Sequence, residues 1–293
     1  MRLGTFRRGD RIFVGVVKEN LVIDLAVTAI KLPGAEQADL FSDMKRTIDN
    51  LPLIDGVLAK AADAAVTFPL SELTVLAPIL NPEKIICIGL NYLDHAKESE
   101  MALPEEPVFF NKFNSSLTGP DSPVVMPRLS TQIDYEGELA VVIGKRGKYI
   151  PEDQAMSYVA GYTAFNDVSA RDLQFRGGQW IKGKALDGFA PLGPFLVTAA
   201  EIADPHRLKI RTLLNGVAMQ DSTTAMMIFK IPRLISFLSE LFTLEPGDLI
   251  ATGTPPGVGF ARKPPVFMKP GDSVTVSIEG IGDLTNPVVG PER

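Results

Sequence analysis

Short apolar runs separated by glycine and proline dominate the chain from about residue 76 onwards. This pattern is typical of β-strands joined by turns. Asn215-Gly216 predicts a hairpin turn, because both residues tolerate positive φ. Residues 233–242 carry apolar side chains at helical spacing, and Pro232 suits the first turn of that helix. The expected fold class is α+β and β-dominated. Strands are expected at residues 84–89, 107–110, 139–144, 159–165, 208–214, 249–252 and 273–278.

Residues 1–75 are interpreted as a small N-terminal region with a cap or scaffold role, preceding a catalytic domain at 76–293. Runs 12–17 and 21–25 flank a polar turn, which predicts a β-hairpin. Residues 41–58 have a helical composition that Pro52 is expected to interrupt. No group of side chains suited to catalysis occurs in this region.

Composition excludes several classes of function. The 293 residues are 45% hydrophobic, which is enough for a substantial core, and the net charge of −6 argues against a nucleic-acid partner. The single cysteine, Cys87, excludes an internal disulfide and cysteine-rich zinc sites. No apolar run approaches the ~20 residues of a membrane span, and the first residues lack the apolar core of a signal peptide. A cytoplasmic protein without a membrane partner is expected.

Three acidic residues are candidates for a metal site. Glu136 and Glu138 are two apart at the start of a predicted strand, so their side chains should share one face. Asp167 follows another predicted strand. Carboxylate oxygens suit magnesium, manganese or calcium, although a solvated strand end is the simpler explanation of an isolated Glu-x-Glu. The sequence does not say whether the two strands are neighbours.

A second candidate is the pair His95 and Glu98, in a polar segment that follows a predicted buried strand. At a separation of three residues the two side chains would meet on one helical turn. The carboxylate would then orient the imidazole and raise its basicity, which suits a general base for water. The simpler alternative is an incidental pair on a surface helix.

Two further segments indicate ligand contacts. Lys184 lies among small and apolar residues, where a buried ammonium group would need an anion. Residues 252–259 are rich in glycine, threonine and proline but lack the Gly-Lys-Ser/Thr of a nucleotide-binding loop. Such a turn can offer backbone N–H groups and a hydroxyl to a carboxylate, or it can be a plain surface turn.

Taken in order, these segments resemble the fumarylacetoacetate hydrolase family, from near Asn81 to near Val289. No single motif decides the resemblance, but their number and order make it specific. The N-terminal region matches only loosely. The matching segments are Gly89-Leu90-Asn91-Tyr92 with His95 and Glu98, Ser115-Ser116, Gly119-Pro120, Asp134 to Leu139, Asn166 to Gln174, Gly183-Lys184, Gly193-Pro194 and Thr252-Gly253-Thr254-Pro255.

The resemblance implies a mixed β-sandwich roll with a small N-terminal region, usually as a homodimer. It also implies roles for individual positions. They are Mg²⁺ or Mn²⁺ held by Glu136, Glu138 and Asp167, a catalytic pair of His95 and Glu98 on a lid, Lys184 at the substrate, and substrate contacts from Arg171, Gln174 and Thr254.

The function expected from this resemblance is metal-dependent cleavage of a carbon–carbon bond in a 2,4-dioxo acid, giving pyruvate and a carboxylic acid. His95, oriented by Glu98, would activate the attacking water, and Lys184 would help to stabilise the pyruvate enolate. An oxaloacetate decarboxylase or a 2-oxo acid isomerase would use the same enolate and remain alternatives. A metal-stabilised binding module without catalysis is the alternative from a different class, which metal-dependent turnover of any 2-oxo acid would exclude.

Overall fold

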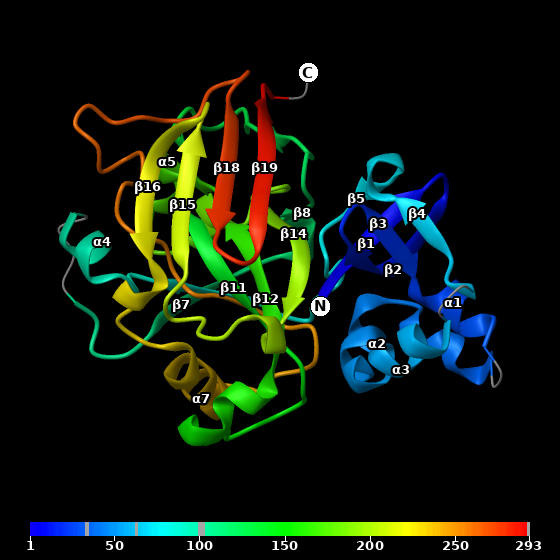
Figure 1. Cartoon of the computed structure of the whole chain (residues 1–293). Coiled ribbons are helices and arrows are strands. Elements are labelled where there is room, and N and C mark those ends of the chain that lie inside the picture. Colours follow the sequence, from blue (N-terminus) through cyan, green and yellow to red (C-terminus); the bar gives the residue numbers. More distant parts are fainter. Residues whose placement is uncertain (33–34, 62–63, 99–102, 292–293) are drawn as a thin grey trace.

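In the part that the structure describes, the N-terminal region contains antiparallel strands, three short α-helices and two 3₁₀ helices (Figure 1). The computed structural model describes residues 1–32, 35–61, 64–98 and 103–291, without the side chains of 35–37 and 95–97. β2 and β3 form the predicted hairpin, with Lys18 opposite Leu21. The elements are β1 (Arg2–Arg8), β2 (Arg11–Lys18), β3 (Leu21–Asp24), β4 (Thr67–Pro69), β5 (Thr74–Val75), α1 (Leu25–Ile30), α2 (Met44–Asp49) and α3 (Leu51–Ala61).

A twelve-stranded mixed sheet runs through both parts of the chain. Its order is β4-β3-β2-β1-β14-β12-β11-β17-β6-β7, with β5 beside β1 and β8 beside β14. β1 pairs with β14, so the N-terminal strands extend the sheet of the catalytic part. β17 and β6 are parallel, whereas β11 and β12 are antiparallel. The added strands are β6 (Ile85–Gly89), β7 (Val108–Lys112), β8 (Leu117–Thr118), β11 (Gly137–Ile143), β12 (Val159–Asn166), β14 (Ala190–Thr198) and β17 (Leu249–Ala251).

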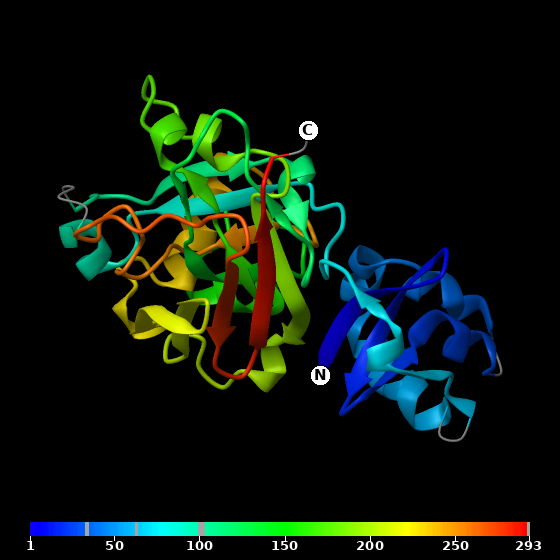
Figure 2. The same ribbon diagram turned by 90° about the horizontal axis from the view of Figure 1, so that it is seen from above.

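A five-stranded sheet packs against β11, β12 and β14, as Figures 1 and 2 show from two directions. Its order is β16-β15-β18-β19-β9. A two-stranded ladder of β10 and β13 lies beside the segment that carries the acidic residues. The remaining elements are β9 (Val124–Val125), β10 (Ile133–Asp134), β13 (Ser169–Ala170), β15 (Lys209–Leu214), β16 (Val217–Thr223), β18 (Ser273–Ile278), β19 (Gly282–Val289), α4 (Leu93–Glu98), α5 (Arg171–Gln174), α6 (Ile181–Lys184) and α7 (Ile231–Leu241). Short 3₁₀ helices span Ala35–Phe41, Leu70–Glu72, Asn114–Ser116, Glu152–Tyr158, Ala199–Glu201 and Thr224–Met226.

Strand β11 is buried on both faces, which explains its continuous apolar run. Leu139, Val141 and Ile143 face the core between the two sheets. Ala140 and Val142 point the other way, into a core shared with the N-terminal region. Because side chains alternate along a strand, Glu136 and Glu138 lie on the same face as Ala140 and Val142. The carboxylates therefore face away from the sandwich core.

The predicted β-dominated α+β fold is confirmed, and so is the hairpin at Asn215-Gly216, where both residues have positive φ. Pro52 does not interrupt a helix as expected. The break falls at Asn50, and Pro52 lies in the first turn of α3, where the N–H that proline lacks has no helical partner. None of the helices in the described ranges has the length and apolar content needed to span a bilayer.

Candidate active site

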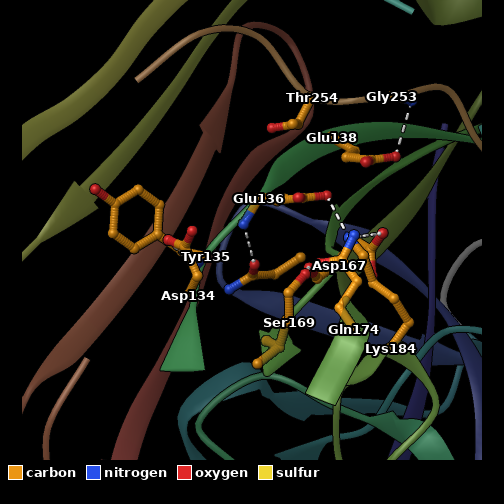
Figure 3. Close-up of polar contacts among 12 residues, drawn as sticks. Asp134, Tyr135, Glu136, Glu138, Asp167, Ser169, Gln174, Lys184, Gly253 and Thr254 are labelled. Atoms are coloured by element: carbon orange, nitrogen blue, oxygen red, sulfur yellow. Dashed lines mark hydrogen bonds and ion pairs between the residues drawn. The ribbon is translucent and has the colours of Figure 1, made fainter. Parts of the chain in front are cut away.

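Three carboxylates, of Glu136, Glu138 and Asp167, lie together where two neighbouring strands meet (Figure 3). Gly137 of β11 is opposite Asn166 of β12, so the residue before β11 lies beside the residue after β12. The Asp167 N–H donates to the Glu136 carbonyl at 2.9 Å. One oxygen of each carboxylate lies within 4.8 Å of the others, and all three residues are buried. Antiparallel pairing thus brings Asp167 beside two glutamates that precede it by 29 and 31 positions.

Two buried lysines balance part of this negative charge. Lys184 Nζ, at the end of α6, donates to Glu136 at 2.7 Å and to Asp167 at 2.9 Å (Figure 3). Burial alone would lower the pKa of Lys184, but Asp167 and Glu136 raise it, so the amine stays protonated. Lys112 Nζ, from β7, lies 2.6 Å from the other Asp167 oxygen and donates to three backbone carbonyls.

Arg171 connects the acidic cluster to the pocket wall. Its Nε donates to Asp134 at 2.8 Å, and its Nη1 lies 2.7 Å from Glu136 and 2.9 Å from the Gln174 side-chain oxygen. Its Nη2 is buried and has no hydrogen-bond partner among the described residues. Asp134 also accepts the Gly259 N–H at 2.7 Å, which fixes the loop opposite Arg171. Arg171 therefore has an N–H group available for an anionic ligand.

Glu138 lacks the positive charge that its neighbours have. Its carboxylate accepts the Gly253 N–H at 2.9 Å and forms no ion pair within the described part of the chain. Burial, followed by the charges of Asp167 and Glu136, raises its pKa well above the usual value. Carboxylate oxygens are the ligands that hard divalent cations prefer, and such a cation would supply the positive charge that Glu138 lacks. The donor set therefore fits Mg²⁺ or Mn²⁺.

The loop that follows β17 is held against the acidic segment through Thr254. The Thr254 hydroxyl donates to the Gly137 carbonyl at 3.0 Å and accepts from the Gln220 amide at 2.8 Å. The Gln220 side-chain oxygen in turn accepts the Gly137 N–H at 3.0 Å. Since its hydrogen is engaged, Thr254 positions this loop, and any substrate contact from it remains a proposal.

The segment of the predicted catalytic pair forms helix α4, at the end of Figure 1 away from the N-terminal region. Glu98 lies on this helix, and both of its carboxylate oxygens accept the Gly257 N–H, at 2.9 and 3.0 Å. This contact ties α4 to the loop of Thr254. The side chain of His95 lies outside the described residues, so its pairing with Glu98 stays a prediction.

These groups surround one small pocket of about 40 Å³. It is far smaller than the 300–1,000 Å³ of sites for drug-sized ligands, which favours a small substrate. The predicted residues that line it are Glu136, Glu138, Arg171, Gln174, Lys184 and Thr254, and apolar walls come from Ile88, Leu90, Phe110, Phe175, Trp180 and Phe260. Asp167 contacts Lys184 but is not a lining residue.

Sequence reasoning missed Lys112 and Gln220. Lys112 ends the apolar run of β7, and a lysine at a strand end is ordinarily solvated. Gln220 lies in a hairpin strand whose alternation gives no sign that its amide is buried against the acidic segment. Both roles depend on contacts between distant segments, which local periodicity does not encode.

A family model described as "Fumarylacetoacetate (FAA) hydrolase C-terminal" matches residues 84–289. The chain belongs to the fumarylacetoacetate hydrolase family. A Xenopus laevis protein named as a mitochondrial oxaloacetate tautomerase is 54% identical over 221 residues, which cover 75% of this chain and 69% of the relative.

Solved structures of the family share the whole fold. The fumarylacetoacetate hydrolase of psychrophilic Exiguobacterium antarcticum is 37% identical, with a TM-score of 0.85 over 99% of each chain. The maleylpyruvate hydrolase of Sphingobium sp. SYK-6, solved with manganese(II) and pyruvate, is 31% identical, with a TM-score of 0.81 over 100% of each chain. The expected family and fold are thus confirmed, and the chain is an enzyme of this family.

Besides the roles of the individual site residues, three sequence expectations remain predictions. They are the division of the chain at residue 75, the homodimer and the cytoplasmic location. The printed name of the Xenopus laevis relative places that protein in mitochondria, so it lends no support to the last.

Proposed function

We propose that the protein is a metal-dependent tautomerase that interconverts the enol and keto forms of oxaloacetate. The observation that carries this proposal is the 54% identity with a relative of that name. The isomerase alternative from the sequence is therefore favoured over the carbon–carbon hydrolase. The small pocket and its cationic side chains agree with a short dicarboxylic substrate.

Ketonisation moves one proton: the enol oxygen loses it and C3 gains one, without a bond to water. The ammonium of Lys184, held by Glu136 and Asp167, is proposed to donate a hydrogen bond to the developing enolate oxygen. The unpaired Nη2 of Arg171 is proposed to bind a substrate carboxylate, with Gln174 fixing the guanidinium. His95 is proposed to move the proton at C3.

Glu136, Glu138 and Asp167 are proposed to hold Mg²⁺ or Mn²⁺, for which the buried oxygen donors fit. When bound, the cation supplies Lewis-acid stabilisation of negative charge on the 2-oxo oxygen. Glu138 would gain the counter-charge that it lacks among the described side chains.

Acylpyruvate hydrolysis is the second candidate, supported by the likeness to two structures named as hydrolases. It needs a base for water, and the proposed pair of His95 and Glu98 on α4 would supply one. Replacing His95 by alanine should then abolish hydrolysis and leave metal binding nearly intact. Oxaloacetate decarboxylation requires no attacking water and remains a further alternative.

The test is to follow the ultraviolet absorbance of enol-oxaloacetate with magnesium-loaded protein and to identify products by NMR. Faster ketonisation without carbon dioxide or pyruvate supports the tautomerase. Release of pyruvate and carbon dioxide from oxaloacetate would instead identify a decarboxylase. Cleavage of a short acylpyruvate as the main activity would identify a hydrolase.

Lys184→Met should lower kcat/KM by about 100-fold or more. Lys182→Met, an exposed lysine on the same helix, serves as the matched control.

A further inference from the structure

A second, larger cavity adjoins the catalytic pocket. It has a volume of about 680 Å³ and lies along β7 and the start of β6. Among the described residues, two side chains line both cavities, Phe110 and Trp180. These two rings therefore form the partition between the small pocket beside the acidic cluster and a wide groove lined by both apolar and polar side chains.

The two rings of the partition are held by contacts with each other and with residues of the catalytic pocket. The rings of Phe110 and Trp180 meet edge to face, with centroids 5.6 Å apart and an interplanar angle of 73°. On the pocket side, Lys184 Nζ lies 5.2 Å from the centre of the Phe110 ring. Trp180 packs on Gly89, which also lines the catalytic pocket, and an added Cβ at residue 89 would lie 2.6 Å from the indole. Glycine at 89 thus allows the indole to approach β6 closely.

The two rings are not equally fixed. Phe110 belongs to β7, which pairs with β6 through Cys87. Trp180 precedes α6 and follows Gly177 and Gly178, which both have positive φ. Its carbonyl accepts the Gly183 N–H at 2.9 Å, which places the indole one helical turn from Lys184. Removing the indole should therefore connect the pocket to the groove without disturbing the pairing of β7 with β6.

We propose that Trp180 determines the chain length of the substrate. The indole closes the pocket behind the reacting end, so that four-carbon oxo dicarboxylates fit and longer homologues do not. This inference rests on the proposed tautomerase. A steric wall of this kind discriminates by about 10–200-fold per methylene.

The experiment compares Trp180→Ala with the wild type on oxaloacetate, 2-oxoglutarate and 2-oxoadipate. Exchange of C3 hydrogens for deuterium, measured by NMR with magnesium-loaded protein, follows enolisation of all three acids. We expect the ratio of kcat/KM for the six-carbon acid to that for oxaloacetate to rise about tenfold or more. If this ratio is unchanged in a folded Trp180→Ala variant, the proposal is wrong.

Two further variants make the result specific. Phe109→Ala removes a ring that lines the groove but not the pocket, and it should leave the ratio unchanged. Trp180→Phe should change it less than Trp180→Ala. If circular dichroism shows that Trp180→Ala is unfolded, Trp180→Leu replaces it. If Phe109→Ala raised the ratio as much as Trp180→Ala, substrate selection would depend on the groove and not on Trp180.

Failure of the proposed function would be recognised separately. If the wild type exchanges no C3 hydrogens beyond the uncatalysed rate, the tautomerase is wrong. Calorimetric binding of the same three acids to the magnesium-loaded wild type and Trp180→Ala then tests the partition alone. A binding preference for oxaloacetate that weakens about tenfold in the variant supports the partition, and a preference that stays the same refutes it.

Discussion

At the scale of single residues, Glu138 gives the sharpest prediction. Burial and two neighbouring carboxylates raise its pKa, so an ionised Glu138 destabilises the metal-free protein. Glu138→Gln keeps the shape and removes the charge. We expect the metal-free variant to be more stable than the metal-free wild type by roughly 1–3 kcal/mol. Mg²⁺ or Mn²⁺ should raise the melting temperature of the wild type but not that of the variant. Thermal melts with EDTA and with added metal measure both effects.

Glu83→Gln is the matched control, because Glu83 is 60% exposed and lies away from the acidic cluster. It should leave both the metal-free stability and the metal-dependent shift unchanged. A Glu138→Gln protein that metal stabilises as much as the wild type would show that Glu138 is not a ligand.

The sequence predicted the acidic residues and the counter-ion Lys184, but not the second counter-ion, Lys112. Glu136, Glu138 and Asp167 stand at predicted strand ends, and the family resemblance, which their local pattern supports, led to their prediction as a cluster that is indeed buried. Lys112 lies on β7, which pairs with β6, and its amine lies 2.6 Å from Asp167 of a different segment. Such a contact depends on tertiary packing and leaves no trace in the residues on either side.

At the scale of elements, His206 links a loop to the start of α7. Its Nε2 accepts the N–H of Ile231, the first residue of the helix, at 3.2 Å. Burial, then the charge of Lys230, lowers the pKa of His206 below 6.5. As pH falls, His206 is therefore protonated in the unfolded chain before it is protonated in the folded protein. The stability contributed by neutral His206 is present above about pH 6.5 and is lost below it.

Urea unfolding at pH about 5 and about 8 measures this dependence in the wild type and in His206→Gln. Glutamine keeps an acceptor and does not titrate, so the variant should lose less stability on acidification. His95 is unchanged in both proteins and cancels in the comparison. Equal losses would mean that His206 does not respond to pH through this contact.

Helices, strands and turns were easier to predict from the sequence than which strands pair with each other. The Asn215-Gly216 turn and the apolar stripe of α7 are local signals, and both elements formed. The parallel pairing of β17 with β6 joins residues more than 160 positions apart. Periodicity identifies each strand, whereas the choice of neighbour depends on which faces can be buried together.

At the scale of the whole molecule, the N-terminal region shares a core with the catalytic part. Leu3 is fully buried and lies opposite Leu196 of β14. The same cluster includes Val14 of β2 and Ala140 of β11. One apolar core thus contains residues from before and after position 75. A shared core favours cooperative unfolding of the two parts, although they are distinct in architecture (Figure 2).

This cooperativity is testable because Trp180, the single tryptophan, lies in the catalytic part. Leu3→Ala should lower the free energy of unfolding by roughly 2–5 kcal/mol. If the core is shared, the urea midpoints from Trp180 fluorescence and from far-ultraviolet circular dichroism should coincide and shift together. Leu21→Ala, at a position 45% exposed, should shift them by about 0.5 kcal/mol or less. An unchanged fluorescence midpoint beside a separate, earlier transition in circular dichroism would show that residues 1–75 unfold on their own.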